Sequence, residues 1–366
     1  MKYEKILPPD IRFGNGVRKL LPDLLPPGAV LIVCGRHAEA EIRRDLLPAL
    51  SGREFRFAPP VSPELPLSDV AAAVAAAREI GAVNFVGWGG GSAMDCAKAA
   101  AAVAGSDADV AACFYGRAQV PERRNFLVLL PTSAGTGAEV TANAVMVDRA
   151  TGIKQSLRGP GMTADCALVD PELLIGAPDA VVAGSGFDAL TQALEGFLSR
   201  KSDALTRQIS LSAARHILTA LPRAYRNDRT ALTEMARGSL LAGMAFASGG
   251  LGAVHGIGHP AGSAMHIPHG VCCAILLPEV LRWNLPECRE RFAELARGLD
   301  FSGPEALIGH VTDLRRELGL PEDFHSFGDV TAHIPFIVKN CRSGSMQCNP
   351  RALSDADVET LLRRLK

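Results

Sequence analysis

The sequence of 366 residues has no excess of charge of either sign, because 38 basic side chains stand against 39 acidic ones. Proteins that bind nucleic acid or anionic lipid usually carry a basic surplus, so we expect neither partner. No run of about twenty apolar residues is present, and we expect no membrane span. The N-terminal residues hold no apolar signal core, which favours a cytoplasmic protein.

The sequence also lacks paired cysteines of the Cys-x-x-Cys kind. Its nine cysteines are an odd number, and several lie in apolar runs such as residues 271–275. Reduced, partly buried thiols explain this pattern better than disulfides. We therefore expect no structural zinc site made of thiolates.

The apolar pattern changes along the chain, and it predicts two domains. Short β-branched runs at 29–34, 82–88 and 126–130 alternate with alanine-rich helical stretches at 67–80 and 93–103, which is typical of an open parallel α/β sheet. Helical periods dominate from about Pro178 onwards. They cover 187–198, 205–221, 230–247, 272–283, 286–296 and 355–365, while 302–334 shows no clear pattern. We predict an α/β dinucleotide-binding domain at 1–178 and an all-α domain at 179–366, meeting at a cleft.

Two loops follow predicted strands and carry the residues that a nucleotide needs. The first joins strand 82–88 to a helix and contains Gly90, Gly91, Ser92 and Asp95. Glycines there let backbone N–H groups approach a pyrophosphate at a helix N-terminus, although Met94 stands where the last glycine of the usual motif would fall. The second loop, at 131–141, contributes hydroxyl side chains at the end of the next strand, and its candidate residues are Thr132, Ser133 and Thr136.

Four of the nine histidines lie within residues 254–270, namely His255, His259, His266 and His269. Imidazole is a common metal ligand and proton carrier near neutral pH. His255 and His259 are four residues apart, so on a helix they share one face. A break containing Gly262 and Pro268 lets the chain turn so that His269 returns toward the same point. This cluster predicts a metal or proton-transfer site.

Taken together, these residues resemble the iron-containing (group III) alcohol dehydrogenase family. The matching stretches run in order along the chain: Gly89–Ser92 with Asp95, 131–141, Asp170-Pro171-Glu172, 188–191 and 255–270. The resemblance implies a Rossmann-like dinucleotide-binding domain and an all-α metal-binding domain, in a dehydroquinate synthase-like architecture. It also implies aldehyde reduction or alcohol oxidation with NAD or NADP and one divalent metal, Fe²⁺ or Zn²⁺, in a homodimer.

The resemblance implies that Asp188, Gln192, His255 and His269 bind the metal. The family has histidine where this chain has Gln192. Asp188 and Gln192 still share a helical face, but an amide oxygen is a neutral and weaker ligand than imidazole. We expect looser metal binding, a different metal preference or an empty site.

Further roles are implied near the nicotinamide and the adenosine ribose. His259 matches a histidine beside the nicotinamide and is our candidate proton carrier, and Lys154 matches a lysine near the nicotinamide ribose. An acidic residue after the strand beside the adenosine ribose binds the 2′-hydroxyl and repels a 2′-phosphate. This chain has Gly35 there, followed by Arg36, which can pair with a phosphate. We predict a preference for NADP(H).

Three alternatives remain open from the sequence. A metal-independent reductase of the maleylacetate reductase type is kept open by Gln192. A lyase of the dehydroquinate synthase type shares the architecture, but the Pro268-His269-Gly270 segment and the 132–137 loop favour a dehydrogenase. A cofactor-binding protein without catalysis is disfavoured by the conjunction of Asp188 with the three histidines at 255, 259 and 269.

Overall fold

The computed structural model describes residues 10–35 and 38–366. The described chain divides into two compact units. One runs from the described N-terminus through Ser133 and continues over Ala138–Ile175, and the other comprises Ala134–Gly137 and Gly176–Lys366. The 131–141 loop therefore contributes to both units.

The first unit is built on a six-stranded sheet with the strand order β1-β8-β5-β4-β2-β3, and every pairing in it is parallel. This confirms the predicted α/β class. The strands are β1 (Asp10–Phe13), β2 (Val30–Cys34), β3 (Phe55–Phe57), β4 (Asn84–Gly89), β5 (Phe126–Pro131) and β8 (Cys166–Val169), and β6 (Asn143–Asp148) pairs antiparallel with β7 (Ile153–Arg158) in a separate hairpin. The helices are α1 (Leu21–Leu24), α2 (Glu39–Asp45), α3 (Leu67–Glu79), α4 (Gly91–Ala104) and α5 (Val110–Phe114).

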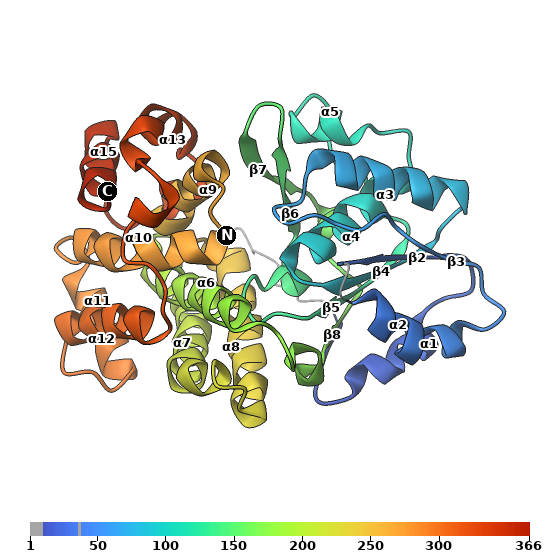
Figure 1. Ribbon diagram of the computed structural model, residues 1–366, viewed down its shortest axis with the longest axis horizontal. Helices are drawn as coiled ribbons and strands as arrows, with labels where there is room; N and C mark the ends of the chain where they lie inside the picture. The colour runs from blue at the N-terminus through green and yellow to red at the C-terminus, as the bar shows by residue number, and fades with distance from the viewer. Residues whose placement is uncertain (1–9, 36–37) are drawn as a thin grey trace. The chain divides into compact units, whose positions relative to one another are not determined.

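Both faces of the sheet are buried, because alternate residues of each strand point to opposite sides. In β2, Leu31 and Val33 pack into the cluster formed with α3 and α4, whereas Val30 and Ile32 pack into the cluster formed with α1 and α2. Figure 1 shows α3 and α4 on one side of these strands and α1 and α2 on the other. Burial on both sides explains why the strands are continuous apolar runs in the sequence.

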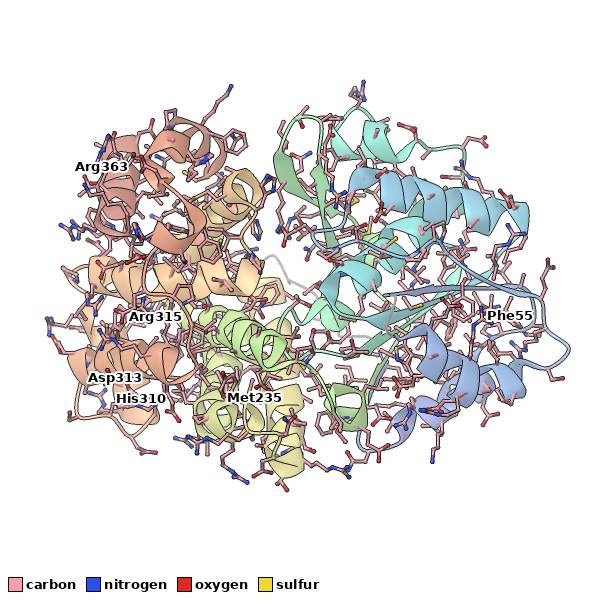
Figure 2. All side chains as sticks on the ribbon, viewed as in Figure 1. Phe55, Met235, His310, Asp313, Arg315 and Arg363 are labelled. Carbon is pink, nitrogen blue, oxygen red and sulfur yellow. The ribbon has the colours of Figure 1, made fainter. Side chains whose placement is uncertain are left out.

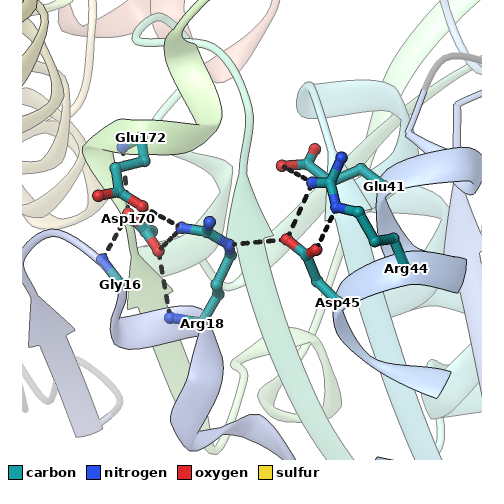
Figure 3. A network of polar contacts seen from close by, with 7 residues as sticks. All are labelled: Gly16, Arg18, Glu41, Arg44, Asp45, Asp170 and Glu172. Carbon is teal, nitrogen blue, oxygen red and sulfur yellow. Dashed lines mark hydrogen bonds and ion pairs between the residues drawn. The ribbon is translucent and has the colours of Figure 1, made fainter. Parts of the chain in front are cut away.

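A network of ion pairs links the segment that follows β1 to the segment that follows β8 (Figure 3). Asp170 is fully buried and accepts hydrogen bonds from the backbone N–H groups of Gly16 at 3.0 Å and Arg18 at 3.3 Å. The Arg18 guanidinium reaches Asp170 at 2.7 Å, Glu172 at 2.6 Å and Asp45 at 3.3 Å. Removing one partner of such a buried pair typically costs about 3–5 kcal/mol. The Asp170-Pro171-Glu172 stretch thus has a structural role.

The second unit is helical. Its helices are α6 (Asp179–Leu198), α7 (Ala204–Ala224), α8 (Arg229–Gly249), α9 (Ala253–Met265), α10 (His269–Asn284), α11 (Arg289–Gly298), α12 (Pro304–Glu317), α13 (Ile334–Asn340), α14 (Gly344–Cys348) and α15 (Asp355–Arg364). Helix α6 begins eight residues before the predicted start, α11 begins three residues after it, and α12 lies in the segment without a clear pattern. Figure 2 shows Met235 of α8, which is buried, and Arg315 of α12, which is buried and paired with Glu322 at 2.9 Å.

No single helix among the described residues is long and apolar enough to cross a membrane. Helices α8 and α9 meet that criterion only when they are taken together across a bend of 104°.

Candidate metal centre and cofactor loops

Three helices of the second unit bring the predicted ligands together. Asp188 and Gln192 lie one turn apart on α6, His255 is the third residue of α9, and His269 is the first residue of α10. Asp188, Gln192 and His255 are each only 3% exposed. A helix presents residues four apart on one face, so α6 directs both of its polar side chains to the same place.

The distances between these side chains are those of groups around a common point. Oδ1 of Asp188 lies 3.3 Å from Nε2 of His255 and 3.6 Å from Nε2 of His269. The two imidazole rings have centroids 5.3 Å apart. A fourth group, the thiol of Cys273, belongs to the same cluster, and the ligand atoms of all four residues lie within 4.8 Å of one another.

Two glycines permit this close packing. A Cβ atom on Gly270 would lie 2.1 Å from the carbonyl oxygen of Gly184, so only glycine lets the start of α10 contact α6 there. A Cβ atom on Gly252, which caps α9, would lie 2.6 Å from Oε1 of Glu195. The glycines that flank the histidines in the sequence therefore set the approach of the helices that carry the site.

Glu195 is a site residue that the sequence analysis missed. Its Oε2 lies 2.7 Å from Nδ1 of His255, and its Oε1 accepts the backbone N–H of Val254 at 2.7 Å. A carboxylate on Nδ1 holds the other ring nitrogen, Nε2, toward Asp188 and makes it a stronger ligand. Glu195 is seven residues after Asp188, on the same helical face, and that spacing is the signal that would have found it.

The electrostatics of the cluster favour bound positive charge. Burial raises the pKa of Asp188, but the nearby His269 and His255 imidazoles and a hydrogen bond from Gln192 lower it below its usual value overall. Burial also disfavours the charged form of His255, yet its contacts with the Asp188 and Glu195 carboxylates raise its pKa to about 9. The two buried carboxylates therefore favour a positive charge at this point, whether it is a proton on His255 or a metal ion.

The donor set fits a divalent metal ion. Carboxylate and imidazole groups are the ligands that zinc and iron take from proteins. Two buried polar atoms, Nε2 of His255 and Oε1 of Gln192, have no well-aligned hydrogen-bond partner among the described residues. Buried polar atoms are nearly always satisfied in folded proteins, and a cation at this point would satisfy Nε2 of His255.

The remaining histidines of the segment differ in position. His259 lies one turn after His255 on α9, is partly exposed, and has its ring 4.9 Å from that of His269 and 6.0 Å from that of His255, centroid to centroid. His266 ends α9 in a left-handed conformation with φ 56° and is exposed. His259 thus borders the cluster, whereas His266 makes the turn between two helices.

The predicted phosphate-binding residues of the first unit lie at the carboxyl ends of the adjacent strands β4 and β5. Gly90 caps α4 directly after β4, and Gly91 and Ser92 form the first turn of that helix. The loop after β5 lies beside it, since the Thr132 N–H donates to the Gly89 carbonyl at 3.0 Å and a Cβ atom on Gly90 would lie 3.6 Å from the Ser133 hydroxyl. Helix α4 has 14 residues, so its N-terminus offers free N–H groups and a positive dipole end to a phosphate.

Gly35 follows β2, the strand next to β4, and a Cβ atom built on it would meet no atom of the described residues within 4 Å. The predicted residue Arg36 lies outside the described residues. Thr136 belongs to the part of the second loop that packs with the helical unit, where a Cβ atom on Gly137 would lie 2.6 Å from Cα of Gly243.

Asp95 and Lys154 have charged partners within the first unit. Asp95 accepts the Val145 N–H at 2.8 Å and pairs at 2.7 Å with Lys98, a fully buried lysine that also donates to the Ala138 carbonyl at 2.8 Å. Lys154, on β7, forms an ion pair with Glu64. Asp95 therefore holds the loops around α4 in place through Lys98. Asp95 thus has a structural role in addition to its predicted role in cofactor binding.

Comparison with known proteins finds relatives over nearly the whole chain. A model of a family described as iron-containing alcohol dehydrogenase matches residues 8–171, and a model of the C-terminal part of the Fe-containing alcohol dehydrogenase family matches residues 182–365. The chain is 37% identical to the probable alcohol dehydrogenase EutG of Escherichia coli (strain K12) over 73% of this chain and 68% of that protein. It is 31% identical to lactaldehyde reductase of the same organism over 95% of this chain and 96% of that protein.

A solved structure shows the same fold. The sulfoacetaldehyde reductase from Bifidobacterium kashiwanohense, determined in complex with NAD⁺, superposes with a TM-score of 0.92 at 28% identity, over 100% of this chain and 99% of that one.

Proposed function

Because this chain belongs to the iron-containing alcohol dehydrogenase family, we propose that it transfers a hydride between a nicotinamide cofactor and an alcohol or aldehyde with the help of one divalent metal ion. The observation that carries this proposal is the convergence of Asp188, His255 and His269 from three helices around one buried point. The relatives are named as dehydrogenases and reductases, which favours this reaction over a lyase reaction.

Asp188, His255 and His269 would hold the metal, and Glu195 would orient His255 through its Nδ1. When bound there, a divalent metal supplies Lewis acidity, which polarises a carbonyl group or lowers the pKa of an alcohol. The buried carboxylates lower the net charge that the site carries with the metal bound. Gln192, the fourth residue of the predicted set, hydrogen-bonds to Asp188 and keeps that carboxylate in place.

The chain's own residues supply binding and proton transfer. The N-terminus of α4, with Gly90, Gly91 and Ser92, would bind the pyrophosphate of the cofactor, and the hydroxyls of the neighbouring loop would orient it. His259 is partly exposed and borders the cluster, so its imidazole can pass a proton between the substrate oxygen and solvent.

We further propose a preference for NADP(H). Among residues 10–35 and 38–366, no atom would lie within 4 Å of a Cβ on Gly35, and the sequence has no acidic residue directly after β2 to repel a 2′-phosphate. The cytoplasmic location and the homodimer remain predictions, and the dimer is tested by light scattering of the purified protein.

The experiment is a spectrophotometric panel of alcohols with NAD⁺ and NADP⁺ and of aldehydes with NADH and NADPH. It is repeated on protein treated with a chelator and on the same protein after metal is restored. The proposal predicts turnover that is lost on chelation and returns with Fe²⁺ or Zn²⁺. Full turnover in chelated protein would instead support the metal-independent reductase, and cofactor binding without turnover on any substrate would support the non-catalytic alternative.

A further inference from the structure

We propose that the Cys273 thiolate, rather than the Gln192 amide, supplies the fourth protein ligand, so that the metal centre is a mixed Asp-His-His-Cys site suited to Zn²⁺ or Co²⁺. The inference rests on the proposed metal site and goes beyond it by assigning a ligand and a metal class. It also refines the expectation that thiolates build no zinc site here, because a single cysteine joins three ligands of other kinds.

The position of Cys273 is that of a ligand. Its Sγ lies 3.8 Å from Oδ1 of Asp188 and 3.7 Å from Nε2 of His269. Zinc bonds of about 2.0–2.2 Å to nitrogen or oxygen and about 2.3 Å to sulfur give a tetrahedron with edges of about 3.4 Å between N and O atoms and about 3.6 Å between sulfur and either. Four of the six edges, at 3.3, 3.6, 3.7 and 3.8 Å, match these lengths to within about 0.2 Å, and all four ligand atoms lie within 4.8 Å of one another.

The helix that carries Cys273 fixes this position. Cys273 is one turn after His269 on α10, so the two side chains share a face. The thiol is fully buried, and it points at the carboxylate of another helix rather than into the apolar core. The adjacent Cys272 is equally buried, but its Sγ lies 4.0 Å from the Ile267 carbonyl oxygen, near the turn before α10.

The Gln192 side chain contacts a metal ligand and is not assigned as a ligand itself. Its side chain donates a hydrogen bond to Asp188, which places the amide nitrogen against the carboxylate and assigns Gln192 to orienting a ligand. A neutral amide oxygen is also a weaker ligand for zinc than a thiolate, which binds the metal as an anion after releasing its proton. Where both residues are within reach, the thiolate is therefore the stronger of the two.

This ligand set changes the metal preference. Thiolate ligands favour Zn²⁺ over harder ions such as Mg²⁺ and Mn²⁺, and imidazole is compatible with that choice. With four protein ligands, the substrate oxygen would be the fifth ligand of the metal. Catalytic zinc reaches this coordination number of five. The centre can thus hold a metal firmly without the family's third histidine.

The test replaces the metal by Co²⁺, because a thiolate bound to cobalt gives a charge-transfer absorption in the near ultraviolet that imidazole and carboxylate do not give. Stripped full-length protein is loaded with one equivalent of Co²⁺, and bound metal is counted by mass spectrometry. We expect the band in wild type, in the neighbouring-cysteine control Cys272→Ala and in Gln192→Ala, and its loss in Cys273→Ser with cobalt still bound. Zinc affinity, measured against a competing chelator, should fall by at least about tenfold in Cys273→Ser and by less in Gln192→Ala.

Each other outcome contradicts the assignment. Bound cobalt without the band in wild type, or the same band in Cys273→Ser, shows that Cys273 is no ligand, and it leaves the proposed hydride transfer intact. A larger loss of zinc affinity in Gln192→Ala than in Cys273→Ser assigns the fourth position to the amide. A wild-type protein that binds no cobalt, yet oxidises NADPH with an aldehyde, overturns the metal site while the hydride transfer stands.

Discussion

Glu195 is expected to control metal affinity without touching the metal, and Glu195→Gln tests this at nearly constant volume. The carboxylate faces two donors, the Val254 N–H and the Nδ1–H of His255, each at 2.7 Å. The two donors bind different oxygens of the carboxylate, and an amide has an oxygen at only one of these two positions. If its oxygen stays with Val254, its NH₂ group faces Nδ1, and the proton of a neutral His255 moves to Nε2, the nitrogen that would bind the metal.

The size of the effect follows from these contacts. An unsatisfied buried donor costs about 1–3 kcal/mol, and loss of an outer partner of a metal-bound histidine typically lowers metal affinity by about 10–100-fold, or about 1.4–2.7 kcal/mol. The two ranges agree, so we expect Glu195→Gln to weaken zinc binding by about 10–100-fold. The affinity is measured by chelator competition near pH 9, where the proton on His255, whose pKa is raised to about 9, lowers the apparent zinc affinity only about twofold.

The matched control is Glu234→Gln. Glu234 also pairs with a histidine, His216, at 2.8 Å, but both side chains are about one-third exposed and belong to α7 and α8. We expect no change in zinc affinity in this variant. A Glu195→Gln protein that binds zinc within about twofold of wild type would refute the reasoning, because it would show that the His255–Glu195 contact does not act on the metal site.

Three further predictions concern other parts of the chain. His259→Ala should keep its bound metal and lose about 10²–10⁴-fold in kcat, and loss of metal in this variant would show that His259 is a ligand. Gly35→Asp adds a Cβ that meets no described atom within 4 Å and should shift the ratio of kcat/KM for NADPH and NADH toward NADH; a wild-type preference for NADH that the variant leaves unchanged would contradict the NADP(H) proposal. Burial raises the pKa of Glu139 from 4.5 to about 7, so its contribution to stability is complete below about pH 4.5 and is lost as the pH rises through about 7. Relative to Glu139→Gln, the free energy of unfolding of the wild type should therefore fall by about 3 kcal/mol across this window. Urea unfolding measures this, and the same pH dependence of the free energy of unfolding in both proteins would contradict the raised pKa of Glu139.

The sequence predicts the main elements of the fold where burial leaves a strong pattern. The strands β2, β4 and β5 are buried on both faces and therefore form continuous apolar runs. The strands β1 and β3 have only 4 and 3 residues and include charged ones, so no pattern marks them. Helix α9 contains Gly256, Gly258 and Pro260, which oppose helix formation, and tertiary packing decides its structure.

The candidate metal site is predictable only in part, for a related reason. Helical spacing shows that Asp188 and Gln192 share one face and that His255 and His259 share another, but it does not show which residue of a third helix completes the cluster. Cys273 lies in an apolar run and resembles any buried core thiol. Only the approach of α10 to α6, permitted at Gly270, places its sulfur beside Asp188.

The central claim is that one metal ion, held by Asp188, His255 and His269, is required for hydride transfer. Metal-stripped protein is titrated with Zn²⁺ or Fe²⁺, and both the bound metal and the rate of aldehyde-dependent NADPH oxidation are measured at each addition. The account predicts a rate near zero without metal that rises in proportion to bound metal and levels off at about one ion per chain. A stripped protein that already turns over at the full rate would contradict it.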